Sequence, residues 1–131
     1  MNDLNNLEKK INSELTTKIK NSHINHSQLY LTIDAEDLLE VVLFLKTNVE
    51  FKFKQLIELT AVDYPEKKKR FKMVYMFLSH ENNQRVILYL LINENEIVQS
   101  LTSIFPSSNW MEREVFDMYG IKFKDHPDLR R

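Results

Sequence analysis

A single glycine, Gly120, occurs among the 131 residues of the chain, and this scarcity limits the structures that the chain can form. Dinucleotide-binding loops with the pattern Gly-x-Gly-x-x-Gly and phosphate-binding P-loops each need several positions without a side chain. Nucleotide cofactors held by such loops are therefore excluded. The chain also has no cysteine, which excludes disulfides, thiolate zinc sites and iron–sulfur clusters ligated by its own cysteines. We expect the chain to bind no cofactor and no metal.

The composition is that of a globular protein with a substantial core. Hydrophobic residues make up 43% of the chain. Lysine and arginine number 18 against 19 aspartates and glutamates, so no strong field favours nucleic acid or an anionic membrane. No apolar run approaches the roughly 18 residues of a transmembrane helix, and the first residues lack the apolar centre of a signal peptide. We expect neither a membrane span nor a nucleic-acid partner.

Periodic apolar residues predict a helix, a strand and a second helix in the first third of the chain. Leucine and isoleucine recur every three to four positions from Leu4 to Ile19, which is typical of an amphipathic helix, and residues 1–28 are assigned to this element. Alternation over residues 29–33 predicts a short strand. Asp34 precedes the apolar stripe of a second helix and is expected to cap it.

Three strand-like runs follow and predict an antiparallel meander. They cover residues 56–63, 71–79 and 85–92. Apolar residues occupy both faces of the last two runs, whereas an antiparallel sheet that faces water has one polar face. We therefore expect another segment or another subunit to cover the second face. Spaced apolar residues over 97–105 predict a further short helix, which Pro106 ends.

The predicted order of elements is helix, strand, helix, three strands and two helices. This order indicates a two-layer α+β domain, in which a mixed or antiparallel sheet of about four strands packs with helices. No repeat or linker divides the chain, so we expect one domain over residues 1–131.

The last predicted helix lies in the segment 109–131, where charged and aromatic residues are dense. Asn109 and Glu112 have the spacing of a capping box, so we expect the helix to begin there. Gly120 occupies the position where a left-handed residue ends a helix, and a Schellman motif is expected, with Ile121 against Phe116. The local role of the glycine is therefore to end the helix.

The residues after Gly120 predict a short extended piece. Ile121 and Phe123 alternate with lysines, which indicates one buried face. His126, next to a proline, is expected to be a hydrogen-bonded turn residue. We expect the segment 121–131 to leave the domain and reach a neighbouring protein.

Three groups of residues together resemble a known family. They are Leu59 to Pro65, then Arg70-Phe71 with Val74-Tyr75, and finally Glu112, Arg113, Glu114, Asp117, Gly120, His126, Pro127, Asp128, Leu129, Arg130 and Arg131. The last group combines unusual residue types at fixed spacing, so a chance match is much rarer than for a lone short motif. Over residues 29–131 the chain resembles the thirty-kilodalton subunit of respiratory complex I, which is the C subunit in bacteria and subunit 9 when mitochondrially encoded.

The resemblance implies a non-redox structural or assembly subunit in the quinone module of the peripheral arm. That enzyme, NADH:ubiquinone oxidoreductase, couples electron transfer from NADH to quinone to proton translocation and carries FMN and iron–sulfur clusters on other subunits. The implied partners are the quinone-site subunit and the terminal-cluster subunit. The residues of the last group are expected to form a partner interface, and no catalytic residues are expected in this chain.

Two expectations concern the source and the length of the chain. The composition, rich in asparagine and lysine, suggests an AT-rich genome and favours mitochondrial encoding, with a location at the matrix side of the inner membrane. The alternative is the cytoplasmic side of a bacterial inner membrane. Family members usually continue past the Arg130-Arg131 pair with a long extension, so we expect either a shortened subunit or a split subunit that a separate polypeptide completes.

Other interpretations of the charged residues stay open. Arg113 and Asp117 are four apart and can pair on a helix surface, and Arg130 and Arg131 could bind partner carboxylates. Glu112, Glu114 and Asp117 could simply be the charged start of a helix. The chain could also be a homologous subunit of a membrane-bound hydrogenase or related oxidoreductase. A stand-alone hydrolase would use these acidic residues together with His126 as acid–base groups.

Overall fold

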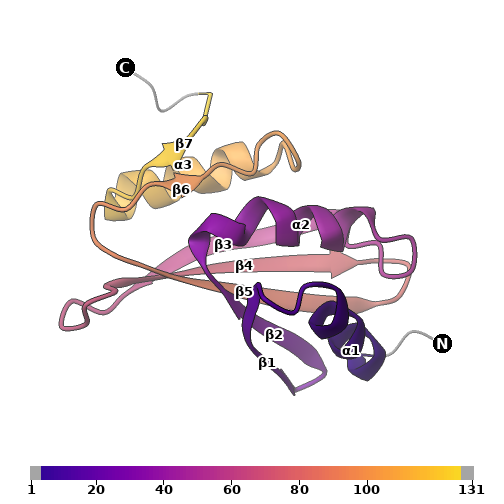
Figure 1. Ribbon diagram of the computed structural model, residues 1–131. Coiled ribbons are helices and arrows are strands. Elements are labelled where there is room, and N and C mark those ends of the chain that lie inside the picture. Colours follow the sequence, from indigo (N-terminus) through magenta and orange to yellow (C-terminus); the bar gives the residue numbers. More distant parts are fainter. Residues whose placement is uncertain (1–3, 128–131) are drawn as a thin grey trace.

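The computed structural model describes residues 4–127, which form a five-stranded sheet, a two-stranded sheet and three α-helices (Figure 1). In chain order the elements are α1 (Leu4–Glu14), β1 (Ile19–Asn25), β2 (Gln28–Ile33), the 3₁₀ turn η1 (Ala35–Asp37), α2 (Leu38–Thr47), β3 (Gln55–Asp63), β4 (Phe71–Ser79), β5 (Gln84–Ile92), β6 (Val98–Gln99), α3 (Ser108–Tyr119) and β7 (Phe123–Lys124). No helix of these residues is long and apolar enough to cross a membrane.

The large sheet has the strand order β1-β2-β5-β4-β3 and is mixed. Its β3, β4 and β5 form the predicted antiparallel meander, while β2 pairs with β5 in parallel and with β1 in antiparallel orientation. The α+β class and the meander are therefore confirmed. The sheet has one strand more than the expected four, because β1 was not predicted.

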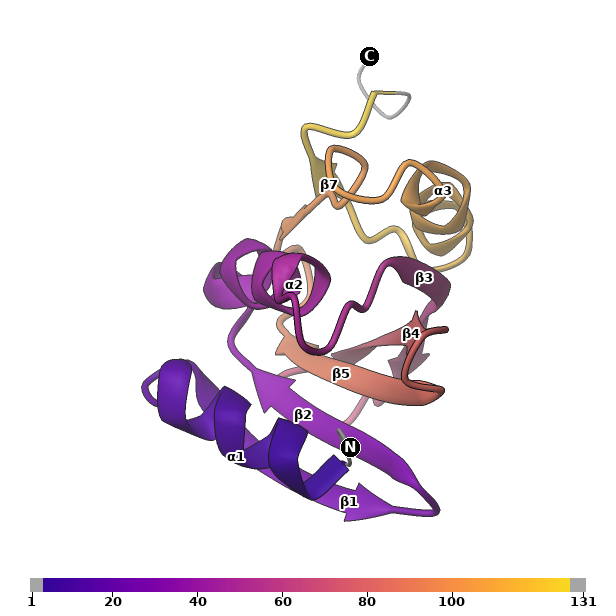
Figure 2. The ribbon, with the colours of Figure 1, turned by 90° about the vertical axis from the view of Figure 1, so that its right-hand side faces the viewer.

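One face of this sheet forms the core of the domain. A single row across four strands joins the side chains of Leu31, Leu88, Tyr75 and Leu59, none of which is more than 6% exposed. Figures 1 and 2 place α1 over β1 and β2, α2 over the middle strands and α3 beside β3, all toward this face. Alternating apolar residues thus bury one side of each strand against the helices.

The N-terminal helix is shorter than predicted, because α1 ends at Glu14 and the chain continues as β1. The strand is polar, with no fully buried residue, since it forms an edge of the sheet. His26 and Ser27 make the following turn with positive φ angles of 51° and 62°. Such hairpin turns usually contain glycine or Asn-Gly, so the sequence lacked the usual signal for this hairpin.

Two further local predictions were wrong. Asp34 makes no side-chain cap hydrogen bond, and its carboxylate instead lies 3.5 Å from Lys20 Nζ on the added strand β1. Residues 97–105 form β6 and a set of turns in place of a helix, because the backbone N–H groups of Val98 and Ser100 donate to the carbonyl groups of Lys122 and Lys124. The apolar spacing there reflects burial and not a helical period.

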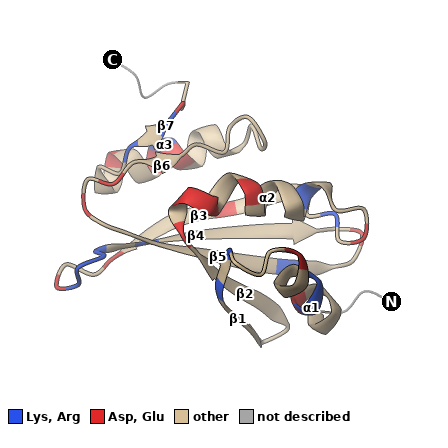
Figure 3. Cartoon of the chain, in the orientation of Figure 1, with Lys and Arg blue, Asp and Glu red and all other residues tan. Residues whose placement is uncertain are grey.

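An ion pair between Asp63 and Arg70 holds the two ends of the connection between β3 and β4 together. Both residues belong to the groups that resemble the family. Arg70 Nε lies 2.7 Å from Asp63 Oδ1, and Arg70 Nη2 lies 2.9 Å from Asp63 Oδ2. Hydrogen bonding from Arg70 holds the pKa of Asp63 below its usual value. Figure 3 shows the basic residues of this turn in blue and, at a distance, the acidic start of α2 in red.

Candidate functional site

The α3 helix begins on stacked turns and not on a capping box. The N–H groups of Ser108 and Asn109 donate to the carbonyl groups of Phe105 and Pro106, and Ser107 at the N-cap makes no side-chain cap bond. Asn109 therefore lies inside the first turn of the helix. The capping-box prediction was wrong, because backbone turns supply the acceptors that a cap would have supplied.

Glu112 is the centre of a buried polar cluster that joins α3 to the preceding segment. Its side chain is fully buried. Oε1 accepts a hydrogen bond from Ser100 Oγ at 2.6 Å, and Oε2 accepts bonds from Leu101 N–H at 2.7 Å and from Ser108 Oγ at 2.5 Å. Glu112 thus holds the turn at residues 100–101 against α3, and it is neither an exposed helix-start charge nor a group that a partner can reach.

His126 packs against the same cluster from the C-terminal side. His126 is 3% exposed, and its Nε2 lies 3.0 Å from the carbonyl oxygen of Asn109 and 3.9 Å from Oε1 of Glu112. Because a carbonyl oxygen can only accept, Nε2–H is the donor. The predicted hydrogen bond of His126 is confirmed, and its partner is the first turn of α3.

Tyr75 of β4 has a buried hydroxyl. The residue is fully buried, and its hydroxyl has no hydrogen-bond partner among the described residues. Burial raises the pKa of Tyr75 well above its usual value, and the negative charge of Glu112 adds to the rise. The phenol is therefore neutral at every physiological pH.

Replacing Tyr75 with phenylalanine is expected to leave the domain at least as stable, with a gain of up to about 1 kcal/mol, because the desolvation cost of an unpaired hydroxyl is removed. Urea unfolding of the two proteins followed by circular dichroism measures the difference. A loss above about 1 kcal/mol would mean that the hydroxyl has a bonding partner.

Gly120 ends α3 as predicted. Its φ of 73° and ψ of 10° are left-handed, and its N–H donates to the carbonyl group of Phe116 at 2.8 Å. This bond is that of the simpler left-handed stop and not the pair of bonds of a Schellman motif. The predicted helix stop is confirmed, with a different bond pattern.

Gly120→Ala is expected to destabilise the domain by about 1 kcal/mol, because a side chain is disfavoured at this positive φ. A Cβ at position 120 would have no heavy atom within 4 Å, so the effect comes from the backbone alone. Thermal unfolding measures it, and Gly120→Asn, which tolerates the left-handed region better, should lose less. Equal melting temperatures for wild type and Gly120→Ala would contradict the helix-stop role.

The chain after Gly120 returns to the domain, contrary to the expectation that it leaves. Ile121 and Phe123 are 4% and 5% exposed, which confirms the predicted extended piece with one buried face. Phe123 and Lys124 form β7, which pairs in parallel with β6. The return occurs because the apolar side chains of this segment bury against the turns that were predicted to be helical. Asp128, Leu129, Arg130 and Arg131 lie outside the described residues.

The solvent side of α3 carries three more charged residues of the family-like group. Trp110 is 68% exposed and Met118 is 73% exposed. Between them lie Arg113, Glu114 and Asp117, all exposed, with Arg113 Nε 3.8 Å from Asp117 Oδ1. The predicted pairing is confirmed, and at this exposure it contributes only a few tenths of a kcal/mol. We call Trp110, Arg113, Glu114, Asp117 and Met118 the outer face of α3.

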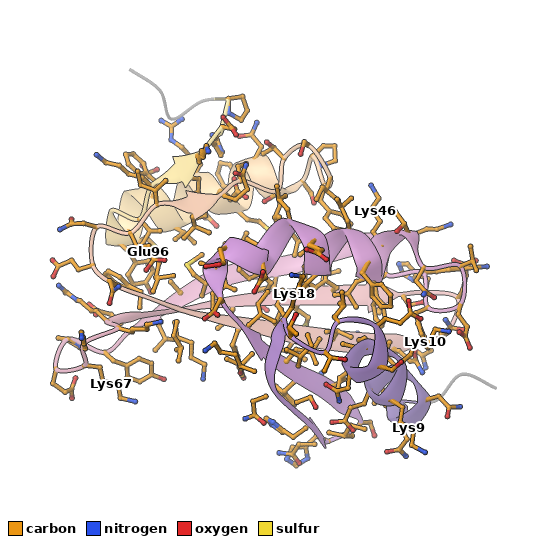
Figure 4. The ribbon with its side chains drawn as sticks, viewed as in Figure 1. Lys9, Lys10, Lys18, Lys46, Lys67 and Glu96 are labelled. Carbon is orange, nitrogen blue, oxygen red and sulfur yellow. The ribbon has the colours of Figure 1, made fainter. Side chains whose placement is uncertain are left out.

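A groove of about 1280 Å³ lies beside this helix, between the start of α2 and the C-terminal segment. Its walls come from residues 35–39, 96–99 and 122–127, and Ile97 in it is 58% exposed. Figure 4 labels Glu96 at one wall, and Lys46 of α2, whose Nζ donates to the carbonyl group of Ile104 at 2.6 Å. Among residues 4–127, no group of three His, Cys, Asp or Glu could hold a metal.

The structure does not assemble an accessible acid–base site of the kind that a hydrolase would need. Glu112 and His126 lie 3.9 Å apart, but both are buried, while Glu114 and Asp117 lie on the outer face of α3. The one acid–base pair that the fold brings together is therefore closed to solvent. Sequence reasoning missed Ser100 and Ser108, because their roles depend on the buried carboxylate of Glu112 and serine alone gives no signal of such a contact. Trp110 is the only tryptophan of the chain, and no local sequence pattern indicates its exposure.

Comparisons with known proteins identify the family. A family model described as "Respiratory-chain NADH dehydrogenase, 30 Kd subunit" matches residues 31–131. The chain belongs to this family. It is 47% identical over 108 residues to the NADH-quinone oxidoreductase C subunit of Ruegeria pomeroyi, covering 82% of this chain and 54% of the relative. The corresponding C subunit of Dinoroseobacter shibae is 48% identical over 110 residues, which are 84% of this chain and 51% of the relative.

Solved structures share the fold of this 30 Kd subunit family member. A trypsin-resistant fragment (1–134) of Nqo5 has a TM-score of 0.79 at 24% identity, covering 94% of this chain and 98% of the fragment. A chain of the membrane-bound sulfane sulfur reductase, an archaeal respiratory membrane complex, has a TM-score of 0.81 at 20% identity, covering 93% of this chain and 71% of its own. The chain spans about half the length of the curated relatives it matches.

Proposed function

We propose that the chain is a non-redox structural and assembly subunit in the quinone module of the peripheral arm of an NADH:quinone oxidoreductase. In this role it supports electron transfer from NADH to quinone, coupled to proton translocation, by holding neighbouring subunits in position. The redox groups, FMN and iron–sulfur clusters, belong to other subunits. The chain itself contributes surfaces and no reacting group.

The observation that carries the proposal is the outer face of α3. Large exposed apolar side chains mark interaction sites, and tryptophan and arginine are the residues that contribute most at protein interfaces. Here an exposed tryptophan and an exposed methionine flank Arg113, Glu114 and Asp117. Membership in the 30 Kd subunit family supports the same conclusion.

The proposed partners are the quinone-site subunit and the terminal-cluster subunit, with the outer face of α3 against one of them. In this proposal the chain is attached to the membrane only through such partners. The relatives named above are bacterial and give no support to a mitochondrial origin. They favour the cytoplasmic side of a bacterial inner membrane, and the matrix side of the mitochondrial inner membrane is the alternative.

Coexpression tests this proposal. The full chain is produced with an affinity-tagged quinone-site subunit and the terminal-cluster subunit from the same organism, and the purified material is measured by size-exclusion chromatography with light scattering. We expect a stable complex that contains one copy of the chain. The flavin-bearing subunit, tagged in the same way, serves as the control and should retain none of it. A chain that elutes as a monomer in both cases would refute the proposal.

A further inference from the structure

The face of the large sheet that lies opposite the helices is open. Side chains alternate along a strand, so the residues next to the buried row point to this second face. One of its rows joins Thr32, Tyr89, Val74 and Thr60 across four strands. Figures 1 and 2 place α1, α2 and α3 toward the other side, and no described helix covers this one.

The centre of the open face is an apolar stripe on β4 and β5. Val74, Met76 and Leu78 are half-buried by their neighbours, Ile87 is 3% exposed and Leu91 is 42% exposed. An antiparallel sheet that faces water carries polar residues at such positions. The expectation from the sequence that something covers this face is therefore not met by residues 4–127.

Toward β1 the stripe continues as a row of neighbouring rings, of which the first two are stacked. The rings of His23 and Tyr30 are parallel within 5°, with centroids 4.8 Å apart, and the ring of Tyr30 is 6.0 Å from that of Tyr89. Lys72 Nζ lies 3.9 Å from the centre of the Tyr89 ring. These flat amphipathic side chains extend the apolar surface at low entropic cost on binding.

Two cations mark the ends of the stripe. Lys72 shares a row with Leu91, and Arg85 shares a row with Leu78. About six residues of β4 separate the two rows, which corresponds to about 20 Å along the strand. No carboxylate of the described residues lies within ion-pair distance of Lys72 or Arg85. Glu58 is the single acidic side chain in these rows, so the face is weakly positive.

We infer that the open face binds an amphipathic α-helix of a partner subunit, with apolar residues over Val74, Met76 and Ile87 and carboxylates near Lys72 and Arg85. A helix of about 13 residues spans about 20 Å. The central strands β4 and β5 already have hydrogen-bonded neighbours on both sides, so a strand cannot add there. A second copy of this face would bring like charges together. With the partner helix bound, the sheet would lie between two helical layers, so the two-layer domain would become a three-layer one.

This inference rests on the proposed function, because the helix belongs to a subunit of the same assembly. The absence of native cysteine allows a direct test with single-cysteine variants. Leu91→Cys and Val62→Cys report on the open face, and Val49→Cys, in the 84% exposed position after α2, is the control. The rate of maleimide alkylation is measured by mass spectrometry for the free full chain and for the purified assembly with the quinone-site and terminal-cluster subunits.

We expect assembly to slow alkylation at positions 62 and 91 at least tenfold and to leave position 49 unchanged. A benzophenone attached at Thr60→Cys should crosslink to residues three, four and seven apart in one partner segment that has acidic residues near both ends. The double variant Lys72→Glu, Arg85→Glu should bind the quinone-site and terminal-cluster subunits at least tenfold more weakly. Its circular dichroism spectrum should equal that of the wild type, which would show that the fold is retained. Lys68→Glu, in the turn between β3 and β4, should have no such effect.

The outcomes separate the inference from the proposed function. An assembly that forms while positions 62 and 91 react as fast as in the free chain overturns the inference alone. Crosslinks to a second copy of this chain, or to every second residue of an extended segment, overturn it as well. If no assembly forms, the proposed function fails and the inference fails with it.

Discussion

Replacing Glu112 with alanine is expected to lower the free energy of unfolding by about 3 kcal/mol, because three buried donors lose their acceptor at once. Ser100 Oγ, Leu101 N–H and Ser108 Oγ all donate to this carboxylate in a place that solvent does not reach. Each unsatisfied buried donor costs about 1–3 kcal/mol, and relaxation of the serine hydroxyls offsets part of the sum. Urea unfolding followed by far-ultraviolet circular dichroism measures the change.

Glu114→Ala is the matched control, since Glu114 lies two residues further along the same helix and is exposed. It should change the free energy of unfolding by less than about 0.5 kcal/mol. Glu112→Gln keeps the shape but replaces one acceptor oxygen with a donor, so its loss should fall between the two. Equal stability of Glu112→Ala and Glu114→Ala would contradict the proposed structural role of Glu112.

The meander was predictable because burial of one strand face leaves a two-residue period in the sequence. In β4 the residues Phe71, Met73, Tyr75 and Phe77 are all buried, and the intervening residues are not. Gly120 was predictable for a similar reason, since the left-handed conformation is a local requirement that favours one residue type. Both features are properties of a few neighbouring residues.

The missed features depend on contacts with other segments, which the apolar pattern of a segment does not reveal. β1 is polar, and it is a strand only because β2 offers a pairing edge. Residues 97–105 have apolar spacing that fits a helix, but β7 pairs with β6 from more than twenty positions away. The burial of Glu112 likewise depends on Ser100 and on His126, which approach α3 from either side. Local propensity cannot contain such information.

The family-like residues of α3 and the segment that follows it, as far as His126, therefore divide into two groups with different physical roles. Glu112, Gly120 and His126 stabilise the C-terminal part of the domain, and a change at these positions acts first on stability. Arg113, Glu114 and Asp117 contribute little to stability at their exposure, so their expected role is in contacts with a partner. The sequence pattern alone does not distinguish the residues that stabilise the domain from those expected to contact a partner.

Trp110→Ala is expected to weaken binding to the partner subunit by about 2–4 kcal/mol, which is roughly 30- to 1000-fold in Kd, because an exposed tryptophan that becomes buried at an interface is a dominant contact. Trp110 is 68% exposed in the free chain. Its replacement should therefore change the free energy of unfolding by less than about 0.5 kcal/mol. Biolayer interferometry with the immobilised chain and the purified quinone-site or terminal-cluster subunit measures Kd.

Val49→Ala provides the control, because Val49 is 84% exposed and lies after α2, away from the outer face of α3. It should leave the Kd unchanged within about twofold. Trp110→Phe retains part of the aromatic surface, so its Kd should lie between those of wild type and Trp110→Ala. If Trp110→Ala binds both subunits as tightly as wild type, the outer face of α3 is not the interface, since no other exposed aromatic residue on this helix could replace the lost contact.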